Sequence, residues 1–480
     1  MASPLDLHIA IIGAGMGGLG CALSLAKKGF KHIAVYESAS DLGFVGAGIQ
    51  LAPNMARILD RLGCWADIEK EATDVLETSI RQGSSDTELV HVDMSGIRAL
   101  YGYAHCTGHR ASLAGEMYKA CLKEPAVRFY FSTALVGVDQ FGPRPVLRLQ
   151  ERAAKKSRSS ENGTNGSQAP VGKVGEKEDA NTAHMTIEVD VLLGADGIKS
   201  ATRGAMFDDL GLTTGEADTG QAAYRIMLTR EQMAHDPEMM RLIDSDLVVR
   251  WIGEQRHIIA YPVANKTIYN LSSTQPDVHF AEAPSATYTT RGSKSAMLDV
   301  FQDFCPLVQR LLNMVPEGEV CEWRLRQHLE LPTWIHGSVA LLGDACHPTL
   351  PHLSQGAAMA IEDGAVIAEV LGRVQMAAPD SVGLGQQATS VRRCLKTYEL
   401  LRKERTSMLV NMAFHSGRVL HLGEGAAREE RDRQFAEHTT DGKKAIPDKW
   451  ASPDVQKIIY SYDCVAETKA EFDHLYATVD

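Results

Sequence analysis

The sequence predicts a mixed α/β fold: a parallel sheet with covering helices, a second sheet that is antiparallel, and a helical C-terminal region. Three observations support this prediction. Apolar runs typical of strands alternate with a helical pattern near the N-terminus, which is the signature of a βαβ unit. Four strand-like segments separated by turn residues occupy residues 221–274. Residues 391–422 repeat their apolar side chains at helical spacing.

Composition excludes several classes of protein. The chain has 480 residues, of which 44% are hydrophobic, so it can bury a large core. A formal net charge of −12 argues against nucleic acid or an anionic membrane surface as its main partner. The 9 cysteines are scattered without a CxxC pair, so we expect no disulfide framework, no metal site and a cytoplasmic location. Residues 9–26 are apolar, but their glycines make a membrane segment a poor interpretation.

The first motif is a glycine-rich turn that follows a predicted strand at His8–Ile12 and opens a helix. Gly13, Gly15 and Gly18 fit the pattern GxGxxG. Gly13 permits the tight turn, Gly15 lets backbone N–H groups approach a pyrophosphate, and Gly18 lets the helix pack on the strand. The same pattern can also be a turn without a ligand, so its context decides between the two.

An acidic residue completes this motif. Gly29 is expected to end the helix, Ile33–Tyr36 is the second predicted strand, and Glu37 closes that strand. A carboxylate at this distance accepts hydrogen bonds from a ribose diol. An acid here favours a dinucleotide with a free 2′-hydroxyl, which means FAD or NAD.

Three further stretches bear on which dinucleotide binds. Small residues at 46–48 would allow the close approach of a bulky planar group, and Arg110 stands just before a helical pattern. Asp196 and Gly197 end one predicted strand. Gly343 and Asp344 end another, where open α/β sheets bind their ligands.

Together these motifs resemble those of the flavin-dependent aromatic hydroxylases, the single-component class A flavoprotein monooxygenases. The matching motifs, in the family's order, are GAGMGG with Glu37, Asp196-Gly197-x-x-Ser200-x-x-Arg203, and Gly343-Asp344-x-x-His347-Pro348. The resemblance covers about residues 7–410. The stretches GAGIQLAPN and HRASL are most similar to the salicylate-hydroxylase branch, which includes 6-hydroxynicotinate hydroxylases and fungal polyketide phenol hydroxylases.

The resemblance implies a Rossmann-type FAD-binding domain (GR2-like) into which an antiparallel substrate sheet is inserted. The implied contacts to a tightly bound FAD come from Gly13, Gly15, Gly18, Glu37, Gly48, Arg110, Asp344, Gly356 and Ala357. We expect Ser354 to cap a helix whose free N–H groups near Gly356 and Ala357 point at the flavin. Reduced flavin carries negative charge, which a helix N-terminus stabilises. His347 and His352 are five residues apart across prolines, so loop packing is favoured over a metal site.

The substrate is expected at the sheet whose strands are predicted at Gln221–Thr229, Leu247–Ile252, His257–Val263 and Ile268–Thr274. In dearomatising fungal relatives, an arginine and a tyrosine in similar positions hold a phenolate against the flavin, which implies catalytic roles for Arg225 and Tyr261. The alternatives are an edge-strand salt bridge for Arg225 and a core aromatic for Tyr261. Hydroxynicotinate-type members carry a histidine where this chain has Gln50, so that substrate is doubtful.

Composition also suggests domain boundaries. The expected parts are an FAD-binding domain of residues 1–77, 105–205 and 335–375, a substrate domain of residues 78–104 and 206–334, and a C-terminal helical region of residues 376–480. Residues 151–184 are polar and rich in Gly, Ser and Lys, which predicts a disordered insertion in a hairpin between strands Val146–Gln150 and Met185–Val191. A linker-like break after residue 375 precedes the long helix, and a helical tail carries Trp450.

The implied activity is that of a monooxygenase. NAD(P)H, a transient co-substrate, reduces FAD, and O2 then forms a flavin hydroperoxide that hydroxylates a phenolic or related electron-rich aromatic, with a role in fungal secondary metabolism as one expectation. A flavin-dependent epoxidase or oxidative cyclase and a non-enzymatic GxGxxG binding protein are the alternatives. A halogenase is disfavoured because its WxWxIP motif is absent. The choice between NADH and NADPH, the type of hydroxylation and the choice between monomer and homodimer stay open.

Overall fold

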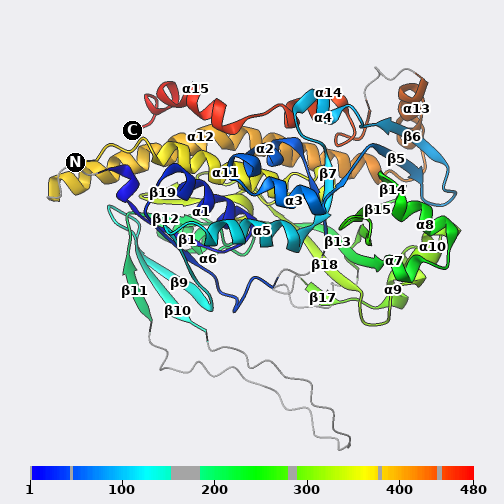
Figure 1. Ribbon diagram of the computed structural model, residues 1–480, viewed down its shortest axis with the longest axis horizontal. Coiled ribbons are helices and arrows are strands. Elements are labelled where there is room, and N and C mark those ends of the chain that lie inside the picture. The colour runs from blue at the N-terminus through cyan, green and yellow to red at the C-terminus, as the bar shows by residue number, and fades with distance from the viewer. Residues whose placement is uncertain are drawn as a thin grey trace, which may run out of the picture.

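The computed structural model describes residues 3–43, 47–152, 184–213, 215–278, 289–376, 381–440 and 446–480. It confirms the expected fold class, with a largely parallel sheet, antiparallel sheets and a helical C-terminal region (Figure 1). None of the helices in these ranges is both long and apolar enough to cross a bilayer. The expected domain boundaries stay predictions.

The first sheet has six strands in the order β19-β20-β12-β1-β2-β8. Its strands are β1 (His8–Ile12), β2 (His32–Tyr36), β8 (Val127–Tyr130), β12 (Val191–Gly194), β19 (Ile335–His336) and β20 (Val339–Leu341). All neighbours pair in parallel except β19 and β20. The predicted strand–turn–helix–strand unit at the N-terminus is therefore confirmed, with α1 (Met16–Lys28) ending at Gly29 in a left-handed conformation.

Helix α1 packs closely against α11 (Gly356–Leu371), which joins the two motifs that lie farthest apart in the sequence. Gly364 of α11 makes this approach possible, because a Cβ there would lie 2.6 Å from the backbone nitrogen of Cys21. The apolar side chains of β1, β12 and β20 fill the core beneath these helices. The turn after β1 and the N-terminus of α11 are thereby held in fixed relative positions.

The second sheet has eight strands in the order β17-β18-β13-β16-β15-β14-β5-β6. Their bounds are β5 (Glu77–Gln82), β6 (Glu88–Asp93), β13 (Glu216–Thr229), β14 (Leu247–Gly253), β15 (Arg256–Val263), β16 (Ile268–Pro276), β17 (Thr289–Arg291) and β18 (Cys321–His328). The four strands predicted between residues 221 and 274 are confirmed. The sheet is not wholly antiparallel, however, because β14 pairs in parallel with β5.

Short helices cover one face of this second sheet, where Trp251 and Tyr269 pack against Met239, Phe301 and Val308 (Figure 1). These helices are α7 (Arg230–Met233), α8 (Pro237–Asp244), α9 (Lys294–Val300) and α10 (Pro306–Asn313). Further elements are β3 (Gly48–Leu51), α2 (Pro53–Arg61), α3 (Trp65–Glu71), β4 (Thr73–Asp74), α4 (Ile97–Tyr101), β7 (Cys106–His109), α5 (Arg110–Leu122) and α6 (Ala201–Asp209). Of these, β3, β7 and β4 form a small antiparallel sheet.

The expected hairpin is present, but its second strand is shorter than predicted. Strands β9 (Thr133–Gln140), β10 (Val146–Glu151) and β11 (Met185–Glu188) form a three-stranded antiparallel sheet. The predicted strand Met185–Val191 is divided, because β11 ends at Glu188 and Val191 begins β12 of the parallel sheet. Asp190 marks the junction, where its carboxylate accepts a hydrogen bond from the backbone of His8. Residues 153–183 of the expected disordered insertion lie outside the described residues.

The C-terminal region consists of α12 (Ser381–Leu420), α13 (Ala426–Thr440), α14 (Pro453–Tyr460) and α15 (Cys464–Tyr476). The predicted linker-like break is wrong from Ser381 onward, because α12 already begins there and contains no proline that would interrupt it. Residues 377–380 lie outside the described residues. Trp450 is buried in a turn before α14 and not in a helix, which corrects the expectation for the tail.

Candidate active site

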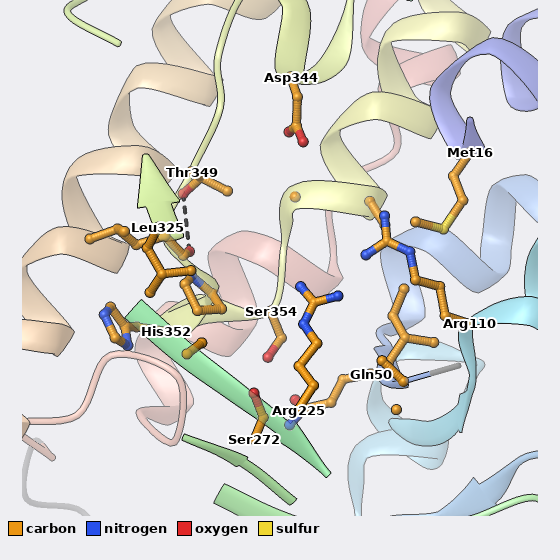
Figure 2. A pocket seen from close by; sticks show the side chains of 18 of the residues that line it. Met16, Gln50, Arg110, Arg225, Ser272, Leu325, Asp344, Thr349, His352 and Ser354 are labelled. Atoms are coloured by element: carbon orange, nitrogen blue, oxygen red, sulfur yellow. Dashed lines mark hydrogen bonds between the residues drawn. The ribbon is translucent and has the colours of Figure 1, made fainter. Parts of the chain in front are cut away.

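A cavity of about 400 Å³ lies where the carboxyl ends of the parallel strands face the eight-stranded sheet (Figure 2). The residues that line it include Gly15 after β1, Gly197 after β12 and Asp344 after β20. The remaining walls come from β3, from the N-terminus of α11 and from strands β13, β15 and β16. This is the edge at which open α/β sheets bind ligands. The cavity therefore unites motifs that are dispersed through the sequence.

The three glycines of the N-terminal turn have different structural roles. Gly13 has φ +100°, and a Cβ at Gly18 would lie only 2.0 Å from the carbonyl oxygen of Gly13. These two positions are required by the turn and by the packing of α1. Gly15 lines the cavity, and a Cβ there would meet no protein atom within 4 Å. The free space at Gly15 fits a bound pyrophosphate close to the backbone.

Glu37 stands at the end of β2, beside this turn. One of its carboxylate oxygens accepts a hydrogen bond of 2.8 Å from the backbone nitrogen of Ala14, and the other accepts one of 2.8 Å from Ala39. Glu37 is not among the residues that line the main cavity. These hydrogen bonds nevertheless fix an acceptor next to the glycine turn, where a ribose diol is expected.

Arg110 and Asp344 both point into the cavity (Figure 2). Arg110 begins α5, and its backbone nitrogen donates to the carbonyl of Ala47. Burial lowers the pKa of Arg110, and the charge of Asp344 partly opposes this effect. Asp344 is open to the cavity although protein surrounds it, and desolvation raises its pKa against the influence of His347 and Arg110. The two side chains form no ion pair with each other, which leaves space for a polar ligand between them.

A buried carboxylate that we did not predict supports Asp344. Asp363 of α11 accepts hydrogen bonds from the backbone nitrogen of Gly343 at 2.9 Å and from Nε of Arg402 at 2.8 Å, and it pairs with Nε2 of His347 at 2.6 Å. Burial would raise the pKa of Asp363, but His347 and Arg402 outweigh burial and lower it to about 2. An acid inside the apolar helical pattern of residues 357–371 was the available signal, because a buried charge needs partners.

Cys346, His347 and Asp363 place their potential ligand atoms within 4.8 Å of one another. Hydrogen bonds already account for this cluster, because Asp363 uses both oxygens and Cys346 donates to the carbonyl of Gly343. The expectation that the chain holds no metal stays a prediction.

In the segment after β12, Asp196 acts as a turn and cap residue. Its carboxylate accepts hydrogen bonds from the hydroxyl of Ser200 at 2.6 Å and from the backbone nitrogen of Thr202 at 2.9 Å, which fixes the start of α6. Arg203 then donates from its guanidinium to the carbonyl of Ala345 at 2.8 Å. The second motif is thereby tied to the loop that carries Asp344.

Gly356 and Ala357 line the cavity at the first turn of α11, and their contacts with FAD stay predictions. The predicted cap is wrong, because Ser354 has a left-handed backbone with φ +55° and its side chain makes no capping hydrogen bond. Gln355 is the residue at the cap position instead, and its side chain accepts a hydrogen bond from Asn54. The first N–H groups of α11 therefore have no side-chain cap and can meet an anionic ligand.

Arg225 and Tyr261 lie on the sheet side of the cavity. Arg225 belongs to β13, which is an inner strand, so an edge-strand salt bridge does not describe it. Its guanidinium lies 4.4 Å from the ring centre of Trp323, and it forms no ion pair with a residue in the described ranges. Burial and the charge of Arg110 lower the pKa of Arg225 to about 10. Tyr261 of β15 is buried and lines the cavity, and burial raises its pKa.

Gly48 explains how β3 approaches this wall. Its backbone nitrogen donates to the side-chain oxygen of Asn270 at 2.7 Å, and a Cβ at Gly48 would lie 2.8 Å from the ring of Tyr261. Other cavity residues that we did not predict are Asn270, Ser272, His257 and His352. The alternation of the strands that carry His257, Asn270 and Ser272 was readable, but the sequence does not say which face of a sheet lines a cavity.

Residues 6–383 match the family described as FAD binding domain. The chain belongs to this family. It is 29% identical to the FAD-dependent monooxygenase OpS4 of Beauveria bassiana over 96% of both chains. It is 30% identical to 3-hydroxybenzoate 6-hydroxylase 1 of Aquipseudomonas alcaligenes over 88% of this chain and 92% of that protein.

Solved structures agree on the fold. A salicylate hydroxylase in complex with substrate superposes with a TM-score of 0.72 at 21% identity, covering 97% of this chain and 98% of that one. The protein CtdE in complex with FAD and a substrate gives a TM-score of 0.75 at 17% identity, covering 98% and 99% of the two chains. The family match and the named relatives confirm the predicted family, the enzyme class of FAD-dependent monooxygenases and the cofactor FAD.

Proposed function

We propose that this enzyme uses NAD(P)H and O2 to hydroxylate a phenolic or related electron-rich aromatic substrate. The observation that carries this proposal is Arg225, which has no counter-ion among the residues that the structure describes and lies in the cavity that also contains Asp344 and the N-terminus of α11. A guanidinium without an acidic partner in a desolvated site favours an anionic ligand. Bound FAD would supply the reaction with O2 and the transferable oxygen.

The residues present fit FAD. The free space at Gly15, the side chains of Arg110 and Asp344 and the uncapped start of α11 offer a pyrophosphate site and polar groups along one cavity. Glu37 offers an acceptor for a ribose beside the glycine turn, outside the lining of that cavity. We assign Gly356 and Ala357 to the flavin end, because the N–H groups of a helix N-terminus stabilise negative charge. Gly13, Gly18 and Gly48 serve this site through backbone packing.

Arg225 would bind the ionised hydroxyl of the substrate. Its positive charge lowers the pKa of a bound phenol, and the ring of the resulting phenolate is more nucleophilic than that of the neutral phenol. Tyr261 stays protonated because burial raises its pKa, so its hydroxyl can donate a hydrogen bond to the same oxygen. The buried walls exclude water, which protects the reacting atoms from side reactions.

The named activities of relatives support an aromatic substrate. Besides the 3-hydroxybenzoate hydroxylase, a 6-hydroxynicotinate 3-monooxygenase of Bordetella bronchiseptica is 29% identical over 91% of this chain and 98% of that protein. Both names describe oxygen addition to a ring that already carries a hydroxyl group. The cytoplasmic location, the monomeric or homodimeric state and the role in secondary metabolism stay predictions.

Purified protein tests the proposal directly. We expect a yellow sample with flavin absorption, and NAD(P)H oxidation and O2 uptake that rise when a phenol from a panel of phenols, salicylates and resorcinols is added. The product should carry one additional oxygen by mass spectrometry. A colourless protein that cannot be loaded with FAD, or one whose NAD(P)H oxidation responds to none of these compounds, would contradict the proposal and favour a non-enzymatic binding protein.

A further inference from the structure

One wall of the cavity carries three neighbouring imidazoles. His352, in the turn before α11, and His257 of β15 line the cavity, and His421 lies behind them after α12. Nδ1 of His257 and Nε2 of His421 are 2.7 Å apart, which is a hydrogen-bond distance. The ring of His352 lies 5.4 Å from that of His257 and 5.6 Å from that of His421, measured between ring centres. In the view of Figure 2, His352 is on the opposite side of the cavity from Arg110.

His352 is a buried polar group that finds no hydrogen-bond partner among the residues that the structure describes. Its side chain is 2% exposed, and neither ring nitrogen has a hydrogen-bond partner in the described part of the chain. Buried polar atoms almost always have one, so an unpaired imidazole at a cavity wall points to a ligand. The helix behind the ring leaves no room for a partner, because a Cβ at Gly417 of α12 would lie 2.6 Å from Nε2 of His352. Nε2 therefore faces α12, which leaves Nδ1 as the ring nitrogen that a ligand in the cavity could meet.

Arg250 determines what kind of group can bind here. It lines the same cavity and forms a buried ion pair with Asp448 at 2.8 Å. Burial and the charge of Arg250 lower the pKa of His257, His352 and His421, so all three rings are neutral at neutral pH. A neutral imidazole offers one donor and one acceptor and no charge. This wall therefore suits a neutral hydroxyl or carbonyl group and not an anion.

We propose that His352, together with His257, binds a second, neutral polar group of the substrate and so determines specificity. This inference rests on the proposed function, in which Arg225 binds the anionic group. It narrows the substrate class to aromatics with at least two polar substituents: one that ionises, and a hydroxyl or carbonyl elsewhere on the molecule. A ligand hydroxyl would complete the hydrogen bonding of His352, whereas an unsubstituted ring would leave the imidazole unpaired, which is costly.

The test compares ligands that differ by one hydroxyl. We would titrate the FAD-bound enzyme by calorimetry with 3-hydroxybenzoate against benzoate, and with 6-hydroxy-2-naphthoate against 2-naphthoate. Two pairs are used because they place the hydroxyl group at different distances from the carboxylate. In at least one pair we expect the hydroxylated ligand to bind about 10-fold or more tightly, the usual effect of a hydrogen bond made in a buried polar site.

Variants of His352 then test whether this residue causes the difference in affinity. His352→Phe should keep its FAD content and bind the two ligands of that pair within about 2-fold of each other, because the hydrogen bond is gone. His352→Gln retains a donor and an acceptor and should restore part of the difference. His415→Gln is the matched control: it changes an exposed imidazole of α12 that does not line the cavity, and the preference should remain.

Several outcomes would overturn the inference. Equal affinities within both pairs, or no binding by any of the four ligands, would exclude a hydroxyl-binding wall even if His352→Phe does not fold. If His352→Phe weakened the binding of both members of a pair by the same factor, His352 would have a packing role only and would not recognise the hydroxyl group. Failure of the proposed function is a different result: the wild-type enzyme would then lack flavin or show no NAD(P)H oxidation stimulated by a phenol.

Discussion

Nε of Arg402 and Oδ1 of Asp363 are 2.8 Å apart in an ion pair that is completely buried between α12 and α11. Arg402 also lies 2.7 Å from Glu362, and Arg405 pairs with the same glutamate at 3.1 Å. Two acids in the middle of α11 are thus neutralised by two guanidiniums of the next helix. Asp363 in turn fixes the backbone of Gly343, beside Asp344 of the cavity.

The first prediction concerns this ion pair. Arg402→Leu should lower the free energy of unfolding by about 3–5 kcal/mol, because a buried acid then loses its partner. It should also weaken FAD retention, because Gly343 is held through Asp363. Urea unfolding and flavin content measure the two effects. The control is Lys70→Ala, which removes an exposed pair with Asp67 and should leave the urea midpoint unchanged.

The second prediction separates two glycines of the same turn. Gly15→Ala should fold normally but bind FAD at least 10-fold less tightly, because its methyl group enters the space of the pyrophosphate. Gly18→Ala should instead lower the thermal midpoint of the apoprotein, because its methyl group would meet the carbonyl of Gly13. FAD titration and apoprotein melting distinguish them. Two variants with equal melting losses and equal FAD affinities would be inconsistent with this assignment.

Arg225→Ala is expected to keep FAD bound and to reduce kcat/KM at least 100-fold, about 2.7 kcal/mol of transition-state stabilisation. Its activity should shift to higher pH, because the substrate phenol must then ionise without the guanidinium. Arg225→Lys should retain part of the activity through its charge. Arg230→Ala, at an exposed pair with Asp244 just past β13, is the matched control. Normal product formation by Arg225→Ala would rule out the proposed role.

Acid should destabilise the enzyme through its buried imidazoles. Burial lowers the pKa of His257 and His352, and that of His421 to about 4, from the usual 6.5. The unfolded chain then binds more protons than the folded one below pH 6.5, so stability falls as pH drops from there toward the folded pKa. Each neutral imidazole contributes up to about 1.4 kcal/mol per pH unit.

Urea unfolding at pH 7.5, 6.5 and 5.5 measures this loss of stability. In the His421→Gln variant, the free energy of unfolding should decrease less steeply as the pH falls. Asp363 cannot produce the effect, because a carboxylate whose pKa is lowered to about 2 loses its stabilising contribution only below its unfolded value near 3.8. Unfolding free energies that do not change between pH 7.5 and 5.5 would argue against neutral imidazoles in the folded state.

Local patterns predicted the elements that depend on nearby residues. The unit from β1 to Glu37 follows from glycine positions and apolar spacing, and the strands β13 to β16 follow from alternation and turn residues. The cavity residues Arg110 and Asp344 followed from a resemblance across separate motifs, because no local rule brings residues so far apart together.

What the sequence did not predict depends on tertiary contacts. The parallel pairing of β14 with β5 joins segments that are distant in the chain, and no turn between them indicates its direction. Serine is a common helix-cap residue, but Ser354 has a left-handed backbone, and Gln355 occupies the cap position instead. The role of Asp363 requires knowing that Arg402 lies opposite, which follows only from the packing of α12 on α11.

The ion pairs of α11 have a consequence for how this protein can be shortened. The match to the family ends at residue 383, only two residues after α12 begins. The guanidiniums that compensate Glu362 and Asp363 come from Arg402 and Arg405, beyond that limit. A fragment that ends at residue 383 would leave these two carboxylates buried in an apolar helix without their positively charged partners. The end of the family match is therefore not a boundary at which this polypeptide can be divided, and autonomous expression of the nucleotide-binding part requires most of α12.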